Sequence, residues 1–152
     1  MHRRRATNGR LDSLETCVCT RRTALAMAAV ALLAPRAKAA PAEHQEFIEA
    51  AFRMKDEALR AGDQPFGAVV VKDRRIIGFG PSRVMTRKDW TAHAEREAIR
   101  AAQARLGSAD LSGCLLYSTS RPCSNCEAAA AAAGIARMFH GSDAADAGVP
   151  RA

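Results

Sequence analysis

Aromatic residues are scarce in this sequence, making up 5% of its 152 residues. No uninterrupted apolar run approaches 18 residues, which excludes a protein with several transmembrane helices. A disordered chain is excluded as well, because 48% of the residues are hydrophobic and 26% are charged. A chain of this length and composition is expected to form one domain with its own core.

Basic residues outnumber acidic residues by 23 to 16, but the excess lies almost wholly at the N-terminus. Residues 1–39 hold eight basic and two acidic side chains, whereas residues 40–152 hold fifteen and fourteen. The body of the chain is therefore almost neutral. Binding a phosphate backbone normally needs clustered Lys and Arg, so the sequence does not favour a nucleic-acid partner.

The N-terminal segment has the pattern of a bacterial export signal. Arg21 and Arg22 precede an apolar run over residues 24–33, and a small-x-small site ends at Ala39. The arginine pair resembles a twin-arginine signal, whose passengers cross the membrane already folded. We predict that residues 1–39 are a cleaved signal read by the twin-arginine export machinery, and that the mature protein, residues 40–152, is periplasmic or secreted. The alternatives are an unprocessed anchor and a misassigned start codon.

Cysteine is also sparse in the body of the chain. Two of the five cysteines lie upstream of the apolar run and would leave with the signal. The three that remain, Cys114, Cys123 and Cys126, are too few and odd in number for a disulfide framework.

The body alternates between patterns typical of helices and of strands. Apolar residues recur at helical spacing in three segments, each closed by glycine, and short apolar runs read as strands. A loop is expected at 80–91. This order predicts an α/β domain in which helices pack on a mixed sheet. The predicted helices are 43–61, 92–106 and 123–133, and the predicted strands are 66–71, 76–79, 115–118 and 135–140.

Two clusters of chemically active residues open predicted helices. His93 and Glu95 begin one helix, and Cys123 and Cys126 begin another. A Cys-x-x-Cys pair alone is ambiguous, since it serves redox chemistry as well as zinc binding. Two thiolates and one imidazole together make a three-ligand zinc site with one open position, which is more often catalytic than structural.

Glu95 is the natural proton carrier beside such a site. A water on the metal is acidified toward neutral pH and becomes a nucleophile, which needs a nearby base. Residues two apart on a regular helix point about 200° away from each other. His93 and Glu95 can therefore converge only if His93 lies in an irregular first turn.

These residues resemble the signature of the zinc-dependent cytidine and deoxycytidylate deaminase superfamily, in which H-x-E is followed by P-C-x-x-C. Within it, the chain is most similar to the branch of guanine, cytosine and tRNA adenosine deaminases. The resemblance implies a three-layer α/β fold with helices on both faces of a mixed sheet. It implies a homodimer, and a hydrolase that replaces an exocyclic amine of a nucleobase with oxygen. Zn²⁺ would be held by His93, Cys123 and Cys126, and Glu95 would carry the proton.

The same resemblance indicates where substrate would bind. Phe66 and Gly67 open a strand at the expected pocket wall, and Ser82 stands where the branch often carries a base-binding Asn. Arg121 stands where the branch often carries Glu, and the sequence ends at Ala152, before the further helices of relatives. The expected substrate contacts are Phe66, Gly67, Ala68, Ser82 and Ala92.

Three functions therefore compete. The first is a zinc deaminase of a free nucleobase or nucleoside. The second is a tRNA adenosine deaminase, which an exported and nearly neutral body disfavours. The third is a non-catalytic zinc or thiol-redox module, which leaves Glu95 without a role.

Overall fold

The structure is a computed structural model that describes residues 42–152. The predicted export signal, residues 1–39, lies outside the described residues and stays a prediction. Within residues 42–152 no helix combines the length and the apolar character that crossing a membrane requires.

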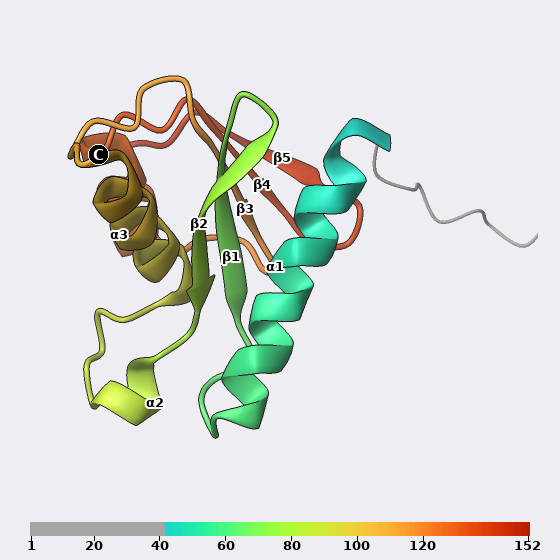
Figure 1. Cartoon of the computed structure of the whole chain (residues 1–152), viewed down its shortest axis with the longest axis vertical. Coiled ribbons are helices and arrows are strands. Elements are labelled where there is room, and N and C mark those ends of the chain that lie inside the picture. The colour runs from blue at the N-terminus through green and yellow to red at the C-terminus, as the bar shows by residue number, and fades with distance from the viewer. Residues whose placement is uncertain (1–41) are drawn as a thin grey trace, which may run out of the picture. The chain divides into compact units, whose positions relative to one another are not determined.

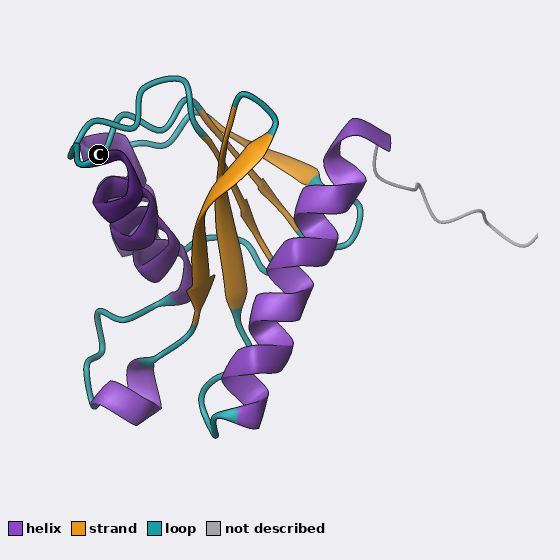
Figure 2. Ribbon diagram, viewed as in Figure 1, coloured by secondary structure: helices purple, strands orange, loops and turns teal. Residues whose placement is uncertain are grey.

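Four helices and five strands make up the described chain, and they place one sheet between helices (Figures 1 and 2). The sheet order is β2-β1-β3-β4-β5, in which only β3 and β4 pair in parallel. The predicted mixed sheet is thus confirmed. The elements are α1 (Ala42–Arg60), β1 (Gly67–Lys72), β2 (Arg75–Pro81), α2 (Val84–Arg87), α3 (Ala94–Leu106), β3 (Leu115–Ser118), α4 (Ser124–Ala132), β4 (Arg137–His140) and β5 (Ala145–Gly148).

Helices cover both faces of this sheet, as predicted. Successive residues of a strand point to opposite faces, and β1 follows this rule. Ala68 and Val70 pack in one cluster with residues of α3 and α4. Val69 and Val71 pack in a second cluster with Phe47 and its neighbours on α1. The result is the three-layer α/β fold.

Glycines in β1 and β2 let the helices approach closely. A Cβ at Gly67 would lie 2.2 Å from a backbone atom of α1, and a Cβ at Gly80 would lie 2.1 Å from the carbonyl oxygen of Ala94 on α3. These contacts fix the start of α3 against β2. The first turn of α3 is where the sequence places His93 and Glu95.

Two elements differ from the predicted arrangement. The segment 80–91, predicted to be a loop, contains the short helix α2, and the edge strand β5 follows the last predicted strand. In addition, α3 begins at Ala94 and not at residue 92, so His93 precedes the helix. This last difference matters for the site.

Candidate metal centre and substrate pocket

The backbone at His93 provides the irregular turn that convergence with Glu95 requires. His93 is the residue before the first helical residue of α3, with extended dihedrals of φ −63° and ψ 152°. Its carbonyl oxygen accepts a hydrogen bond from the Glu97 amide at 2.9 Å, so the helix starts directly after it. The imidazole therefore leaves the chain in a direction that a regular helix would not allow.

The cysteine pair is arranged in a similar way at α4. Cys123 precedes the helix with φ −75° and ψ 166°, and its carbonyl oxygen accepts a hydrogen bond from the amide of Cys126 at 2.9 Å. This tight turn brings both sulfur atoms to the same end of α4. Cys123 is exposed and Cys126 is buried.

His93, Cys123 and Cys126 come together although about thirty residues separate the histidine from the cysteines. His93 Nδ1 lies 3.7 Å from the sulfur of Cys123 and 3.5 Å from the sulfur of Cys126. All three donor atoms lie within 4.8 Å of one another. A tetrahedral zinc ion with Zn–S near 2.3 Å and Zn–N near 2.0 Å separates its N and S ligands by roughly 3.6 Å. The donor set and its spacing therefore fit zinc.

The environment of Cys126 also favours a cation at this place. Burial raises the pKa of the Cys126 thiol far above its usual value, and the negative charge of Glu95 and the neighbouring Cys123 raise it further. Without a positive charge the thiol stays protonated. A bound divalent cation supplies that charge and deprotonates a coordinating thiol.

Glu95 lies beside the three donors. Its side chain is 6% exposed, and its Oε2 accepts a hydrogen bond from the Cys126 sulfur at 3.4 Å. A buried carboxylate so close to a zinc-type donor set is placed to exchange protons with a molecule at the open position.

A cavity of about 150 Å³ opens in front of these groups. It is smaller than the clefts of about 300–1,000 Å³ that hold drug-sized ligands, so it suits a single small ring system. Three loops form its wall, namely those before β1, before α3 and before α4. The lining residues are Gln64, Phe66, His93, Ala94, Glu95, Ser120, Arg121 and Cys123.

Among the predicted substrate contacts, Phe66 lines this cavity. The other four do not line it: Gly67 packs against α1, and Ala68 and Ala92 are fully buried. Ser82 is 2% exposed, and its hydroxyl donates to Asp63 at 2.9 Å. Substrate contact by these residues stays a prediction.

Asp63, which belongs to no sequence motif, holds two of the loops together. Its carboxylate accepts hydrogen bonds from the amide of Gln64, the hydroxyl of Ser82, and the amide and hydroxyl of Thr86. Burial by itself would raise the pKa of Asp63, but these donors outweigh it and hold the pKa well below its usual range. The ionised Asp63 thereby joins α2 to the loop that carries Gln64 and Phe66.

Glu97 anchors the start of α3 from the other side. Its buried carboxylate pairs with Arg87 at 2.8 Å and with Arg100 on α3 itself. Arg100 in turn donates to the hydroxyl of Thr91 at 3.1 Å. These contacts tie the segment before His93 to the helix and restrict its movement.

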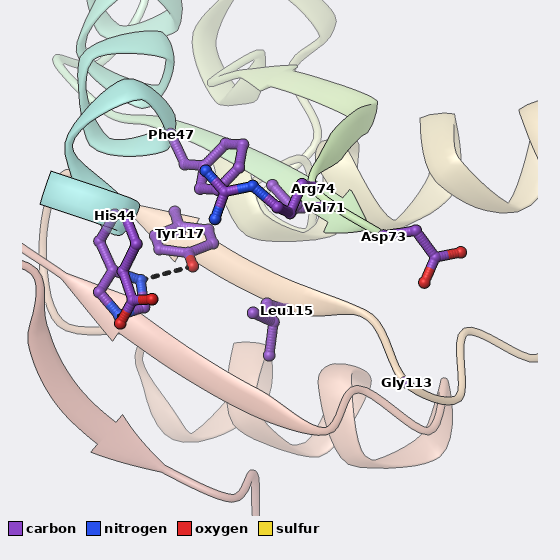
Figure 3. Close-up of a pocket in the computed structure, with 9 residues that line it drawn as sticks. His44, Phe47, Val71, Asp73, Arg74, Gly113, Leu115 and Tyr117 are labelled. Atoms are coloured by element: carbon purple, nitrogen blue, oxygen red, sulfur yellow. Dashed lines mark hydrogen bonds and ion pairs between the residues drawn. The ribbon is translucent and has the colours of Figure 1, made fainter.

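A second cavity, of about 170 Å³, lies near the N-terminal end of α1 (Figure 3). There the ring nitrogen Nδ1 of His44 lies 2.7 Å from the hydroxyl oxygen of Tyr117. None of the predicted site residues lines this cavity. It is therefore distinct from the cavity at the metal centre.

Comparison with known proteins agrees with this fold and donor set. Residues 41–142 match the family described as the cytidine and deoxycytidylate deaminase zinc-binding region. A guanine deaminase of Bacillus subtilis (strain 168) is 42% identical over 109 residues, covering 69% of this chain and 70% of that protein. A tRNA-specific adenosine deaminase of Agrobacterium fabrum is 40% identical, covering 66% of each chain.

Solved structures give the same result. The crystal structure of guanine deaminase from B. subtilis superimposes with a TM-score of 0.62 at 41% identity, covering 65% of this chain and 64% of that one. Guanine deaminase from Nitrosomonas europaea gives 0.59 at 28% identity, covering 66% and 58%. The chain belongs to the zinc-dependent cytidine and deoxycytidylate deaminase family.

Proposed function

We propose that this protein is a zinc-dependent hydrolase that deaminates a free nucleobase or nucleoside. The observation that carries this proposal is the buried Glu95 carboxylate, which lines the same small cavity as His93 and Cys123 and contacts Cys126. A thiol-redox site or a purely structural zinc site does not require a carboxylate for proton transfer. A hydrolytic site needs it.

The chemistry replaces an amine with oxygen on a ring carbon. Water adds to the carbon, a C–O bond forms, the C–N bond breaks, and ammonia leaves. A zinc ion held by His93, Cys123 and Cys126 would supply the Lewis acidity that makes water nucleophilic at neutral pH. The Glu95 carboxylate carries the two protons of the attacking water in turn, the first to the ring nitrogen and the second to the leaving amine.

Residues around Glu95 orient the substrate and exclude water. Phe66 offers an aromatic face at the cavity wall, on which a planar ring can stack. Gln64 and Ser120 add polar groups for the edge of the base. Because the loops that carry these residues are fixed by Asp63 and by the first strand, the pocket is largely formed before substrate arrives.

A free base or nucleoside is preferred over tRNA because the body of the chain is nearly neutral, with fifteen basic and fourteen acidic residues in 40–152. The alternative function, deamination of adenosine in tRNA, is supported by the 40% identity to the Agrobacterium tRNA-specific adenosine deaminase. Both functions would use the same metal centre. They differ in whether anything beyond one base is recognised.

The deciding experiment measures ammonia release by the zinc-loaded protein. Cytosine, guanine, adenine and their nucleosides form one set, and tRNA assayed for inosine forms the other. Turnover on a free base or nucleoside, with none on tRNA, is the expected result. Inosine formation in tRNA alone would move the protein to the tRNA branch, and no turnover on either set would contradict deamination of these substrates.

We further propose that the protein acts in the periplasm after twin-arginine export. Arg21 and Arg22 with the apolar run 24–33 support this. Replacing both arginines by lysine in the full chain is expected to leave the protein in the cytoplasm, as measured by fractionation. Equal amounts of wild type and variant in the periplasm would contradict twin-arginine export.

A further inference from the structure

Ser82 already uses both of its hydrogen-bond donors within the protein. Its hydroxyl is bonded to Asp63 at 2.9 Å, and its amide donates to the carbonyl oxygen of Phe66 at 3.0 Å. The residue is 2% exposed and does not line the cavity. Outside the metal centre and Glu95, the polar side chains that line the cavity are those of Gln64, Ser120 and Arg121.

Arg121 is held at the cavity by the backbone on both sides of it. Upstream, Thr119 makes two hydrogen bonds to Gly67: its amide donates to the Gly67 carbonyl oxygen at 2.9 Å, and its hydroxyl accepts from the Gly67 amide at 3.2 Å. The hydroxyl of Ser118 donates to the carbonyl oxygen of Ser120 at 2.7 Å. Downstream, Pro122 is buried. The position of Arg121 is therefore fixed while its side chain remains exposed.

The guanidinium of Arg121 has no acidic partner in the described part of the chain. Most arginines near the site are paired: Arg83 with Glu57, and Arg87 and Arg100 with Glu97. Arg121 forms no ion pair with any residue of 42–152, and it lies more than 4.0 Å from the carboxylate of Glu95 in the same cavity. The cavity is thus lined by an acid, Glu95, and by a base, Arg121, that has no ion-pair partner among residues 42–152.

This distribution of charge suits a substrate with two different ends. An amine with its ring carbon must face Glu95 and the metal ligands. An anionic group would be repelled by Glu95, and it is attracted to Arg121, whose planar guanidinium matches carboxylate and phosphate oxygens. A neutral base would leave Arg121 without a partner.

We propose that Arg121 determines specificity by binding an anionic group, a carboxylate on the ring or a phosphate on the sugar, of an amino-substituted heterocycle. This inference rests on the proposed deaminase function: a ring carboxylate would narrow its substrate class to acidic bases, and a sugar phosphate would extend that class from nucleosides to nucleotides. The arginine acts on substrate binding and takes no part in proton transfer, so its effect belongs to KM more than to kcat.

The test compares matched substrates that differ by one anionic group. Cytidine, adenosine and guanosine are each compared with their 5′-monophosphates, and cytosine with 5-carboxycytosine, so that the two sources of the anion are separated. In the wild type, kcat/KM for the preferred anionic member is expected to exceed that of its neutral partner at least about tenfold. Arg121→Gln should lower the anionic value about 10- to 100-fold, mostly through KM, and the neutral value less than about threefold.

Two further variants keep this test specific. Arg121→Lys retains the charge and should recover part of the loss. Arg105→Gln removes the same charge from an exposed position on α3 that does not line the cavity, and it should change neither value. Zinc content of each variant is measured, so that a damaged metal centre is not mistaken for lost specificity. Equal losses on neutral and anionic substrates in Arg121→Gln, or no anionic preference in the wild type, would overturn the proposal.

A binding measurement separates this proposal from the deaminase function itself. Titration calorimetry with uracil against 5-carboxyuracil, and with uridine against its 5′-monophosphate, needs no turnover. A preference for one anionic ligand that disappears in Arg121→Gln supports the role of Arg121 even if no amine is released from any substrate. In that case the proposed function alone would fail.

Discussion

The backbone dihedral angles of His93 decide whether its imidazole can reach the Glu95 carboxylate. Because His93 is extended and precedes α3, its imidazole and the Glu95 carboxylate reach the same place, although they are two residues apart. Glu95 is close to the metal ligands without being one of the three clustered donors. Its role can therefore be tested apart from metal binding.

Glu95→Gln is expected to lower turnover about 10²-fold or more, the usual scale for losing a positioned acid–base group. Glutamine keeps the shape and hydrogen-bonding reach of the side chain but cannot accept and return a proton. Ammonia release and zinc content are measured together. Zinc content and folding should be nearly unchanged, and undiminished deamination in the variant would contradict the role of Glu95.

The metal should also contribute to stability. Cys126 is buried next to Glu95, and the raised pKa of its thiol means that the ionised form depends on a bound cation. A ligand that binds only the folded state stabilises it by about 2.7 kcal/mol at one hundred times its Kd. Removing zinc with a chelator should therefore lower Tm by about 10 °C or more, measured by thermal unfolding.

Cys114 provides the matched control for this prediction. It is fully buried, but it lies in the core and outside the donor cluster. Cys126→Ala should lose zinc and its effect on Tm, whereas Cys114→Ala should keep about one zinc per chain. A wild-type Tm that does not respond to chelator, or equal zinc loss in both variants, would contradict this assignment.

At the scale of elements, Asp63 joins α2 to the loop between α1 and β1. Asp63→Asn replaces an acceptor by an NH₂ group that faces the donors of Thr86 or Ser82, and it should cost about 1–3 kcal/mol of the free energy of unfolding at pH 7. Urea unfolding measures it. Asp56→Asn, at an exposed position of α1, is the control and should have little effect.

The pH dependence of this difference has a definite sign. The pKa of Asp63 is lower in the folded protein than the ordinary value near 3.9 of an unfolded chain. Its contribution is therefore complete above about pH 4 and is lost as the pH falls toward the folded pKa. The gap in stability between wild type and Asp63→Asn should shrink from pH 7 to pH 3. A gap that grows on acidification would contradict the assignment.

Local sequence patterns predicted the three long helices and the strand 115–118, because these elements depend mainly on residues close together in the sequence. The strand 115–118 was predicted with its observed bounds, and the helices were predicted within about two residues at each end. The helix α2 was missed because its four residues show no apolar period and its stability comes from Asp63, more than twenty residues away. The strand β5, with the sequence Ala-Asp-Ala-Gly, has no strand propensity and forms by pairing with β4 and through Arg137 with Asp146.

For the site, the spacing of the motif was sufficient to identify the metal donors and Glu95, because each group opens a helix. The polar part of the cavity wall was not predicted. Gln64, Ser120 and Arg121 come from loops that only the folded sheet brings together. No local pattern indicates that Arg121 forms no ion pair with any residue of 42–152. From the sequence alone, Arg121 could equally well form an ion pair, as Arg83 and Arg87 do.

At the scale of the whole molecule, a body of little over one hundred residues has a limited core of its own. A groove of about 270 Å³ is lined by residues of both α3 and α4, namely Arg96, Ile99, Arg100, Gln103, Ala129 and Ala132, together with Ala109 and Ala133. Ala132 on α4 is exposed beside it. Small side chains allow a second helix to approach closely, so we propose that two copies associate through α4.

Light scattering on the protein at tens of micromolar is expected to give twice the mass of one chain. Ala132→Glu places a charge on the contact, where burying it is costly, and should shift the protein to the monomer. Ala61→Glu adds the same charge at an exposed position after α1 and should leave the dimer intact. A monomeric wild type would contradict self-association. A dimer that survives Ala132→Glu but not Ala61→Glu would move the contact from α4 to α1.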